Sequence, residues 1–216
     1  LPAGMSACFN VRIPMRDSIH LSADIYFPSR TSGPYPTIVI RTPYDNTASS
    51  IVDNAVSYTQ NGYVFVAQDV RGRHDSDGMF CPWVNEYNDG HDTIEWIGAQ
   101  SWCNGNVGMV GSSYAGNVQW QAAAMGSRYL KAIAPRVIGH NLHEAPHFQG
   151  GAFQLGWAAT WTFRTDGRTA QNIDIFNWEQ LFHTLPLSAI PKIAGKEIQH
   201  YQDWINHPDY DDYWKE

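Results

Sequence analysis

The sequence is poor in cysteine and contains no long apolar run. Only three of its 216 residues are cysteines, Cys8, Cys81 and Cys103, and their spacing matches no metal-binding motif. An odd number of widely spaced cysteines predicts no disulfide framework and favours a reducing, cytoplasmic compartment. No apolar run approaches the roughly 20 residues that a membrane-spanning helix requires. We therefore expect no membrane association.

Basic residues are also scarce, with 14 Lys and Arg against 21 Asp and Glu, which gives a net charge of -7. Binding to nucleic acid or to an anionic membrane needs clustered positive charge, so both partners are excluded. The first ten residues, LPAGMSACFN, lack the charged and apolar regions of a signal peptide. We expect no secretion signal in this segment.

The chain is 43% hydrophobic, which is enough to bury a sizeable core. Turn signals separate β-branched runs over the first sixty residues, and strand patterns then alternate with helical patterns as far as residue 138. This order predicts an α/β fold with a largely parallel sheet and helices on both faces. The expected strands cover residues 7–15, 20–28, 37–45, 63–69, 106–110 and 131–138, and the expected helices cover residues 49–60, 89–100 and 114–125.

The character of the sequence changes after Ile138. Residues 139–216 combine helical and loop patterns with Pro and Gly breaks, and they contain no convincing strand. We therefore predict two parts, the N-terminal part of an α/β domain in residues 1–138 and an inserted helical cap in residues 139–216.

A strand-to-helix turn with a candidate nucleophile lies within GMVGSSYAGNVQW, residues 108–120. In a nucleophile elbow the serine takes a strained backbone conformation, which requires small residues two positions before and two positions after it. For Ser113 these neighbours are Gly111 and Ala115, whereas the corresponding neighbours of Ser112 are bulky. The pattern therefore selects Ser113.

Acyl transfer also needs donors for the developing oxyanion. The backbone N–H of Tyr114 stands at the predicted helix N-terminus, which suits it to this role. The His-Gly-Gly loop that supplies a second donor in many α/β-hydrolases has no counterpart here. At the corresponding place, after the strand TIVIRT, stands Tyr44, whose phenol can donate instead.

Several motifs occur in the order typical of one enzyme family. RTPYDN, QDVRGRHDSDGMF, GMVGSSYAG and LKAIAP resemble the cocaine-esterase-like serine hydrolases, which share a catalytic domain with X-Pro dipeptidyl-peptidases and α-amino-acid ester hydrolases. The resemblance implies an α/β-hydrolase sheet, incomplete at its C-terminal side, with Ser113 as the acyl-enzyme nucleophile. It also implies Tyr44 and the Tyr114 N–H as oxyanion donors and suggests His147 and Trp157 as walls of the acyl pocket.

A serine nucleophile needs a histidine base, which a carboxylate orients. In this fold both follow the serine on loops after later strands, and we find no such strands after residue 138. We therefore expect the triad Asp and His to lie outside this chain. Six histidines follow Ser113, all within the predicted cap, and none of them is favoured as a substitute base: His140, His143, His147, His183, His200 and His207.

Residues 143–147, HEAPH, match the zinc-protease pattern H-E-x-x-H. Pro146 is incompatible with the uninterrupted helix that would direct both histidines toward one metal ion. We therefore predict no metal site and no cofactor. Two readings stay open for the aromatic side chains of this region, which either line an apolar pocket or pack the cap: Phe148, Phe153, Trp157, Trp161 and Phe163.

Charged residues before the serine turn are expected to have structural roles. The loop that begins at Asp69 and contains Arg71 is expected to be shaped by an ion pair beside the site. Glu86, Asp89 and Asp92 are expected to act as caps or dipole partners at a helix N-terminus.

Together these features predict a serine hydrolase that cleaves a small ester or amide through an acyl-enzyme on Ser113. One alternative is the specificity of an X-Pro dipeptidyl-peptidase or of an α-amino-acid ester hydrolase. Another is a non-catalytic fragment or binding module. The resemblance also allows a homodimer of the full-length protein.

Overall fold

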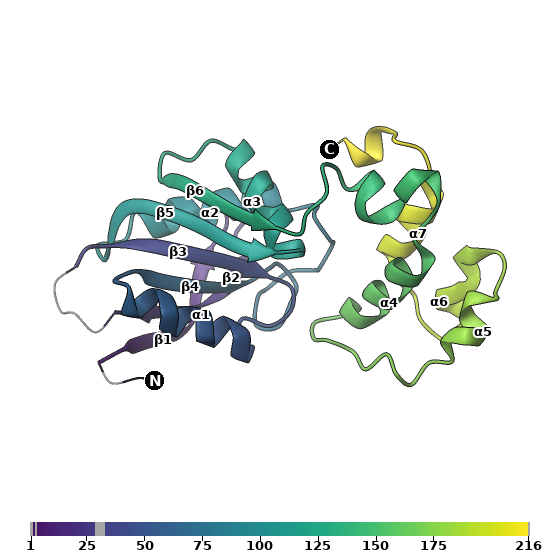
Figure 1. Ribbon diagram of the computed structural model, residues 1–216, viewed down its shortest axis with the longest axis horizontal. Helices are drawn as coiled ribbons and strands as arrows, with labels where there is room; N and C mark the ends of the chain where they lie inside the picture. Colours follow the sequence, from purple (N-terminus) through teal and green to yellow (C-terminus); the bar gives the residue numbers. More distant parts are fainter. Residues whose placement is uncertain (1, 3, 29–32, 216) are drawn as a thin grey trace. The chain divides into compact units, whose positions relative to one another are not determined.

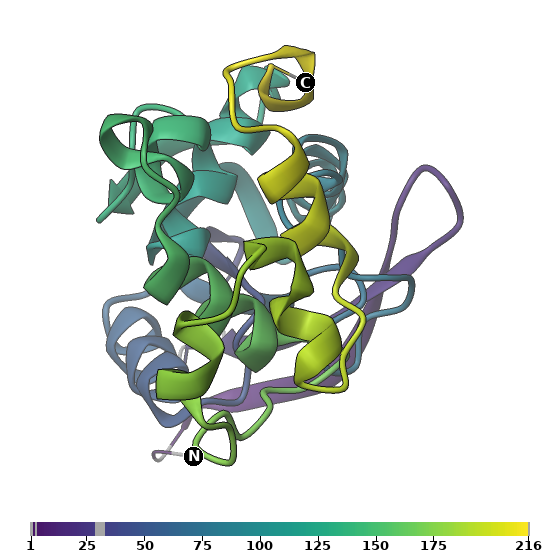
Figure 2. The same ribbon diagram turned by 90° about the vertical axis from the view of Figure 1, so that its right-hand side faces the viewer.

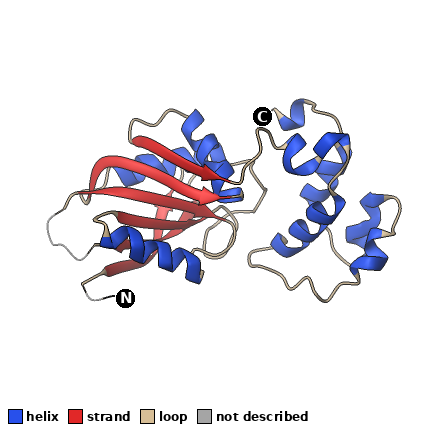
Figure 3. Cartoon of the chain, viewed as in Figure 1, coloured by secondary structure: helices blue, strands red, loops and turns tan. Residues whose placement is uncertain are grey.

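The computed structural model describes residues 2, 4–28 and 33–215 (Figure 1). It consists of two compact units, residues 1–138 and residues 139–216. The first unit contains all the strands of the described residues together with helices, whereas the second is built from helices and loops (Figure 3). Each unit is described separately.

Six strands form one mixed sheet in the first unit, in the order β1-β2-β4-β3-β5-β6. β1 pairs antiparallel with β2, and β2 pairs antiparallel with β4. The remaining neighbours, β4-β3, β3-β5 and β5-β6, are parallel. An N-terminal hairpin followed by a parallel sheet is thus confirmed. The strands are β1 (Ser6–Pro14), β2 (His20–Phe27), β3 (Tyr35–Thr42), β4 (Val64–Asp69), β5 (Cys103–Ser112) and β6 (Leu130–Arg136).

Three helices cover the two faces of this sheet: α1 (Ser49–Gln60), α2 (Glu86–Gly98) and α3 (Tyr114–Ala124). Alternate residues of a strand point to opposite faces. In β4, accordingly, Val64 and Val66 pack in one cluster with residues of α2 and α3, whereas Phe65 and Ala67 pack in another with α1. Because both faces are covered, every residue of β4 is buried.

The N-cap of α1 and the start of α2 differ from expectation. The extent of α1 is confirmed, and Gly62, just beyond its end, has the positive φ of 85° that suits a helix stop. The N-cap prediction of Ser49 or Ser50 is wrong, because the backbone turns into the helix at Ala48 and both serines lie inside it. α2 begins at Glu86, three residues earlier than predicted.

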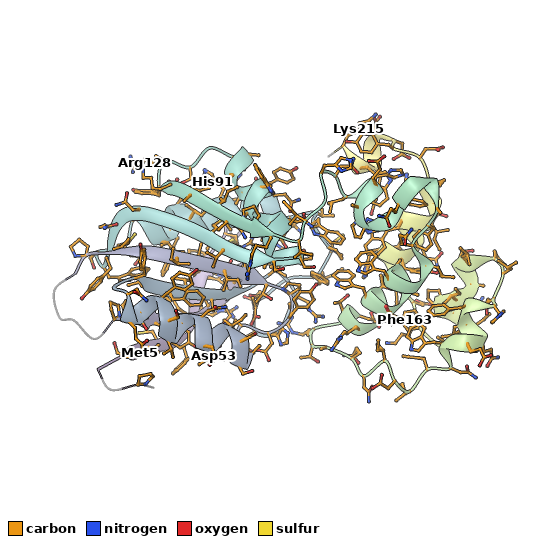
Figure 4. All side chains as sticks on the ribbon, viewed as in Figure 1. Met5, Asp53, His91, Arg128, Phe163 and Lys215 are labelled. Atoms are coloured by element: carbon orange, nitrogen blue, oxygen red, sulfur yellow. The ribbon has the colours of Figure 1, made fainter. Side chains whose placement is uncertain are left out.

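In its described residues, the second unit contains four α-helices and several single turns (green to yellow in Figures 1 and 2). Its core gathers apolar residues from all four of these helices and the loops between them, including Phe163, Leu181, Ile190 and Tyr201. Phe163, labelled in Figure 4, has no exposed surface. The α-helices are α4 (Leu155–Thr165), α5 (Trp178–Phe182), α6 (Ile190–Ile193) and α7 (Gln199–Asn206). The π- and 3₁₀-turns are η1 (His143–His147), η2 (Gln149–Gly151), η3 (Leu187–Ala189) and η4 (Asp212–Trp214).

Among the described residues, no helix combines the length and the apolar character that crossing a bilayer would require.

Candidate active site

Ser113 occupies a tight turn between β5, which ends at Ser112, and α3, which begins at Tyr114. Its backbone has φ 59° and ψ -125°, a conformation that non-glycine residues adopt only where the surrounding structure holds them. The Ser113 N–H donates to the carbonyl of Arg136 at 2.9 Å, which ties the turn to the end of β6. The residue is exposed.

Small residues allow this turn to close. A Cβ at Gly111 would lie 2.6 Å from the Cβ of Ala115, and a Cβ at Gly116 would lie 2.6 Å from Cγ2 of Ile138. Real Cβ atoms do not approach so closely. The close packing of α3 against β5 and against the end of β6 therefore requires glycine at these two positions. Ser112 differs from Ser113, because it is the last residue of β5 and pairs with Arg136 in the sheet.

Tyr114 begins α3, and its ring is buried behind the turn with 1% of its surface exposed. The phenol donates to Oε1 of Glu86 at 2.8 Å and accepts the Trp83 backbone N–H at 3.0 Å. The Tyr114 and Trp83 rings stack with centroids 5.1 Å apart. Burial raises the pKa of the Tyr114 phenol well above its ordinary value, and the Glu86 carboxylate adds to the effect. The phenol therefore stays protonated and remains a hydrogen-bond donor.

A buried ion pair lies next to this tyrosine. Nη1 of Arg41, near the end of β3, is 2.6 Å from Oε2 of Glu86, and the two side chains are 0% and 3% exposed. Nε of Arg41 donates to Oε1 of Gln68 at 2.7 Å. The same Gln68 oxygen accepts the Thr93 hydroxyl of α2 at 3.0 Å. The network thus joins β3, β4 and α2 at the carboxyl end of the sheet.

Tyr44 lies in the loop that follows β3, and 39% of its side chain is exposed. Two buried side chains from the end of β4 and the following loop hold this segment. Oδ1 of Asp69 accepts the Asn46 N–H at 2.9 Å, and Nε of Arg73 donates to the Pro43 carbonyl at 2.9 Å. The loop is thereby fixed on both sides of Tyr44.

The contribution of Asp69, which holds this loop, to the stability of the protein depends on pH. Its side chain has no exposed surface, and burial raises the pKa of the carboxyl group from 3.8 to about 7. Between about pH 4 and about pH 7 the folded state therefore holds one more proton than the unfolded state, so the contribution of Asp69 to stability falls as the pH rises. The loss across this window is on the order of 4 kcal/mol.

The Asp69→Asn protein, whose amide keeps an acceptor for the Asn46 N–H, is expected to lack this loss. Urea unfolding from about pH 4 to about pH 8 measures the free energy of unfolding of both proteins. The difference between them should shift in favour of the variant as the pH rises. A difference that stays constant over the whole range would contradict the assignment.

The loop after β4 is shaped by an ion pair, as expected. Arg71 lies 2.7 Å from Asp17 and 2.6 Å from Asp89. The prediction that the acidic residues of α2 act as caps or dipole partners is incomplete, because their side chains also form ion pairs. Asp92 pairs with Arg16 at 2.7 Å, just as Asp89 pairs with Arg71 and Glu86 with Arg41.

The HEAPH segment forms an irregular turn, η1, in which Ala145 is extended at φ -137° and ψ 107°. Pro146 thus interrupts the motif as predicted. His147 has no exposed surface, and its ring lies 5.1 Å from that of Trp157 and 4.1 Å from that of Trp204. Burial lowers the pKa of His147 to about 3, so the ring is neutral. His147 is thus enclosed by aromatic rings of the second unit, and its role as a wall of the acyl pocket stays a prediction.

The other aromatic side chains of this region fall into two groups. Phe148 and Phe163 are buried, which agrees with a packing role. Trp157 and Trp161 are half-buried and stack with ring centroids 5.7 Å apart. Trp157 stays a candidate for substrate contact. Within the described residues, no group of three or more His, Cys, Asp or Glu side chains is arranged to hold a metal ion.

Comparison with known proteins identifies the family. The model of the X-Pro dipeptidyl-peptidase (S15) family matches residues 17–216. The protein belongs to this family. The predicted family resemblance is thus confirmed.

This member of the S15 family is similar to both esterases and peptidases. It is 38% identical over 232 aligned residues to cocaine esterase of Rhodococcus sp. (strain MB1 Bresler), an alignment that covers 97% of this chain and 40% of that protein. The structure of an α-amino acid ester hydrolase matches with a TM-score of 0.78 and 26% identity over 98% of this chain and 39% of that one. An aminopeptidase from a marine sediment Thaumarchaeota archaeon matches with a TM-score of 0.81 and 21% identity, over the same shares.

These neighbours confirm the α/β-hydrolase fold class. The chain spans about two fifths of the length of the curated relative and of the solved structures named above.

Proposed function

We propose that this chain carries the nucleophile and the oxyanion donors of a serine hydrolase that cleaves small esters or amides. The observation that carries the proposal is the exposed Ser113 in its left-handed turn between β5 and α3. Family membership supports the same chemistry.

In the proposed reaction Oγ of Ser113 attacks the substrate carbonyl carbon and gives its proton to a histidine base. The tetrahedral intermediate collapses, and the alcohol or amine leaves with that proton. Water then attacks the acyl-enzyme, so that a carboxylic acid is released and the Ser113 hydroxyl is restored. No metal or organic cofactor takes part in these steps.

The oxyanion of the intermediate is proposed to accept hydrogen bonds from the Tyr44 phenol and the Tyr114 backbone N–H. Tyr114 is the first residue of α3, so its N–H lies at the positive end of the helix dipole. The Tyr44 loop is held by Asp69 and Arg73, which lets its phenol act as a preorganised donor.

The histidine base and its carboxylate are proposed to come from outside these 216 residues. Two observations support this. The chain spans about two fifths of the length of its relatives, and no strand follows β6 in the described part of residues 137–216. In this fold the acid and the base stand on loops after such later strands.

An ester is the favoured substrate, because cocaine esterase is similar along 97% of this chain. The specificity of an α-amino-acid ester hydrolase or an X-Pro dipeptidyl-peptidase is the alternative. Trp157, half-buried in the second unit, is proposed as a contact for the acyl group. A homodimer of the full-length protein stays a prediction.

Covalent labelling tests the proposal. The complete natural polypeptide that contains this sequence is treated with a fluorophosphonate, which reacts with a serine only when a base has activated it. We expect one adduct, mapped by peptide mass spectrometry to Ser113, and none after heat denaturation.

An adduct on another serine would contradict the role of Ser113. Folded protein that takes up no label would favour the reading as a non-catalytic binding module.

A further inference from the structure

The ion pair between Arg41 and Glu86 is buried behind the serine turn, and neither residue has a role in the proposed reaction. We propose that Arg41, Glu86 and the phenol of Tyr114 are positioning residues that set the place of the two oxyanion donors. This inference rests on the proposed function and adds to it the side chains that hold the donors.

The Tyr114 ring is held at its far end by two hydrogen bonds, one to Glu86 and one from the Trp83 N–H, and along its face by the Trp83 ring. The backbone N–H and the ring share one Cα atom. A ring fixed in this way resists rotation of the first turn of α3, and the direction of the N–H is fixed with it.

The Tyr44 segment is held through Arg41. This arginine stands three residues before Tyr44, and its guanidinium group reaches both Glu86 at 2.6 Å and Gln68 at 2.7 Å. Gln68 is followed directly by Asp69, which accepts the N–H of Asn46 beyond Tyr44. The ends of β3 and β4 are thereby held to the N-terminus of α2. Because Glu86 contacts Arg41 and Tyr114 together, one carboxylate connects the two donor segments.

Burial of the Arg41–Glu86 pair is not explained by stability. Removing two charges from water is costly, and an apolar pair of similar volume commonly gives equal or greater stability. Arg41 and Glu86 are nevertheless almost completely buried. Directional hydrogen bonds fix angles and distances, which apolar contacts do less strictly. Trp83 fits this reading, since it holds a φ of 66° while its N–H binds the phenol and its carbonyl accepts from Gln121.

The test compares two tyrosine-to-phenylalanine variants in the complete polypeptide. Tyr114→Phe removes the phenol and keeps the ring. Tyr201→Phe is the matched control, because Tyr201 is equally buried and its hydroxyl binds a backbone carbonyl, that of Leu187, in the second unit. Tyr114→Phe leaves two buried groups without the phenol and Tyr201→Phe leaves one, so thermal unfolding of both variants is measured beside activity. We expect kcat for an aryl ester to fall about tenfold in Tyr114→Phe, with KM within about twofold of wild type. Displacing an oxyanion donor removes only part of the transition-state stabilisation that deleting the donor would remove.

A wild-type kcat in a folded Tyr114→Phe protein would overturn the proposal, as would an equal fall in Tyr201→Phe. If Tyr114→Phe does not fold, Glu86→Gln replaces it. That variant keeps the shape and an acceptor for the phenol but loses the charge, and it should show the same selective fall in kcat. Ser113→Ala in the same assay separates the two hypotheses, because full activity in that variant would overturn the proposed function itself.

Discussion

The Ser113→Ala protein is expected to have a kcat at least about 10⁴-fold below wild type, with its fold intact. Removal of a serine nucleophile leaves only the contributions of the oxyanion donors and substrate binding. Ser113 is exposed at the surface of the turn, so loss of its hydroxyl leaves no cavity in the core. Steady-state hydrolysis of an aryl ester by the complete natural polypeptide measures the effect, and thermal unfolding confirms that the variant is folded.

The neighbouring serine is the matched control. Ser112 closes β5 in register with Arg136, one residue before the strained position. Ser112→Ala should therefore retain activity close to wild type. If Ser112→Ala were inactive and Ser113→Ala active, the selection of the nucleophile from the small residues at positions 111 and 115 would be wrong.

The Arg41→Met protein is expected to lose about 3–5 kcal/mol of stability. The substitution leaves Glu86, which is 3% exposed, without the guanidinium group that compensates its charge. Breaking a buried pair on one side is costly for this reason. Urea denaturation of both proteins at neutral pH gives the difference in the free energy of unfolding.

Arg16→Met provides the comparison, because Arg16 forms an ion pair of similar length with Asp92 but is 44% exposed. Its loss should be at most about 1 kcal/mol. The double variant Arg41→Met, Glu86→Met should recover much of the stability lost by the single variant, since no uncompensated charge remains. Equal losses for Arg41→Met and Arg16→Met would show that burial of the pair has no energetic consequence.

The parts of the fold that depend on local rules could be predicted from the sequence. Alternation of apolar strands and amphipathic helices gave the α/β class, and helix α1 was predicted at residues 49–60, where it lies. The conformation of Ser113 follows from equally local information, because Gly111 and Ala115 lie within two residues of it and a Cβ at Gly111 would lie 2.6 Å from the Cβ of Ala115.

Features that depend on distant partners could not be predicted in the same way. Glu86 extends α2 by three residues beyond the predicted start, and its partners are Arg41, 45 positions earlier, and Tyr114, 28 positions later. A signal was available in the strand IVIRT, since an arginine within a buried apolar run requires a buried acceptor. The sequence alone does not say which of several carboxylates supplies it.

The surroundings of His147 could not be predicted for a related reason. The family resemblance suggests His147 as a wall of the acyl pocket, which stays a prediction. Its ring is surrounded by Trp157, Trp204 and Trp214 from separate parts of the second unit. These indole rings come together only when the helices pack. The positions of these tryptophans in the sequence do not predict that they surround His147.

The boundary between the two units falls at the peptide bond between Ile138 and Gly139. Ile138 lies against Gly116 of α3, whereas Gly139 approaches Ala145 so closely that a Cβ at Gly139 would lie 2.5 Å from the Ala145 Cβ. Consecutive residues thus contact different units. A larger side chain at Gly116 would therefore disturb packing within the first unit, next to the serine turn, whereas a larger side chain at Gly139 would disturb packing within the second. Two glycines thus hold the chain close on either side of the point where it passes from one unit to the other.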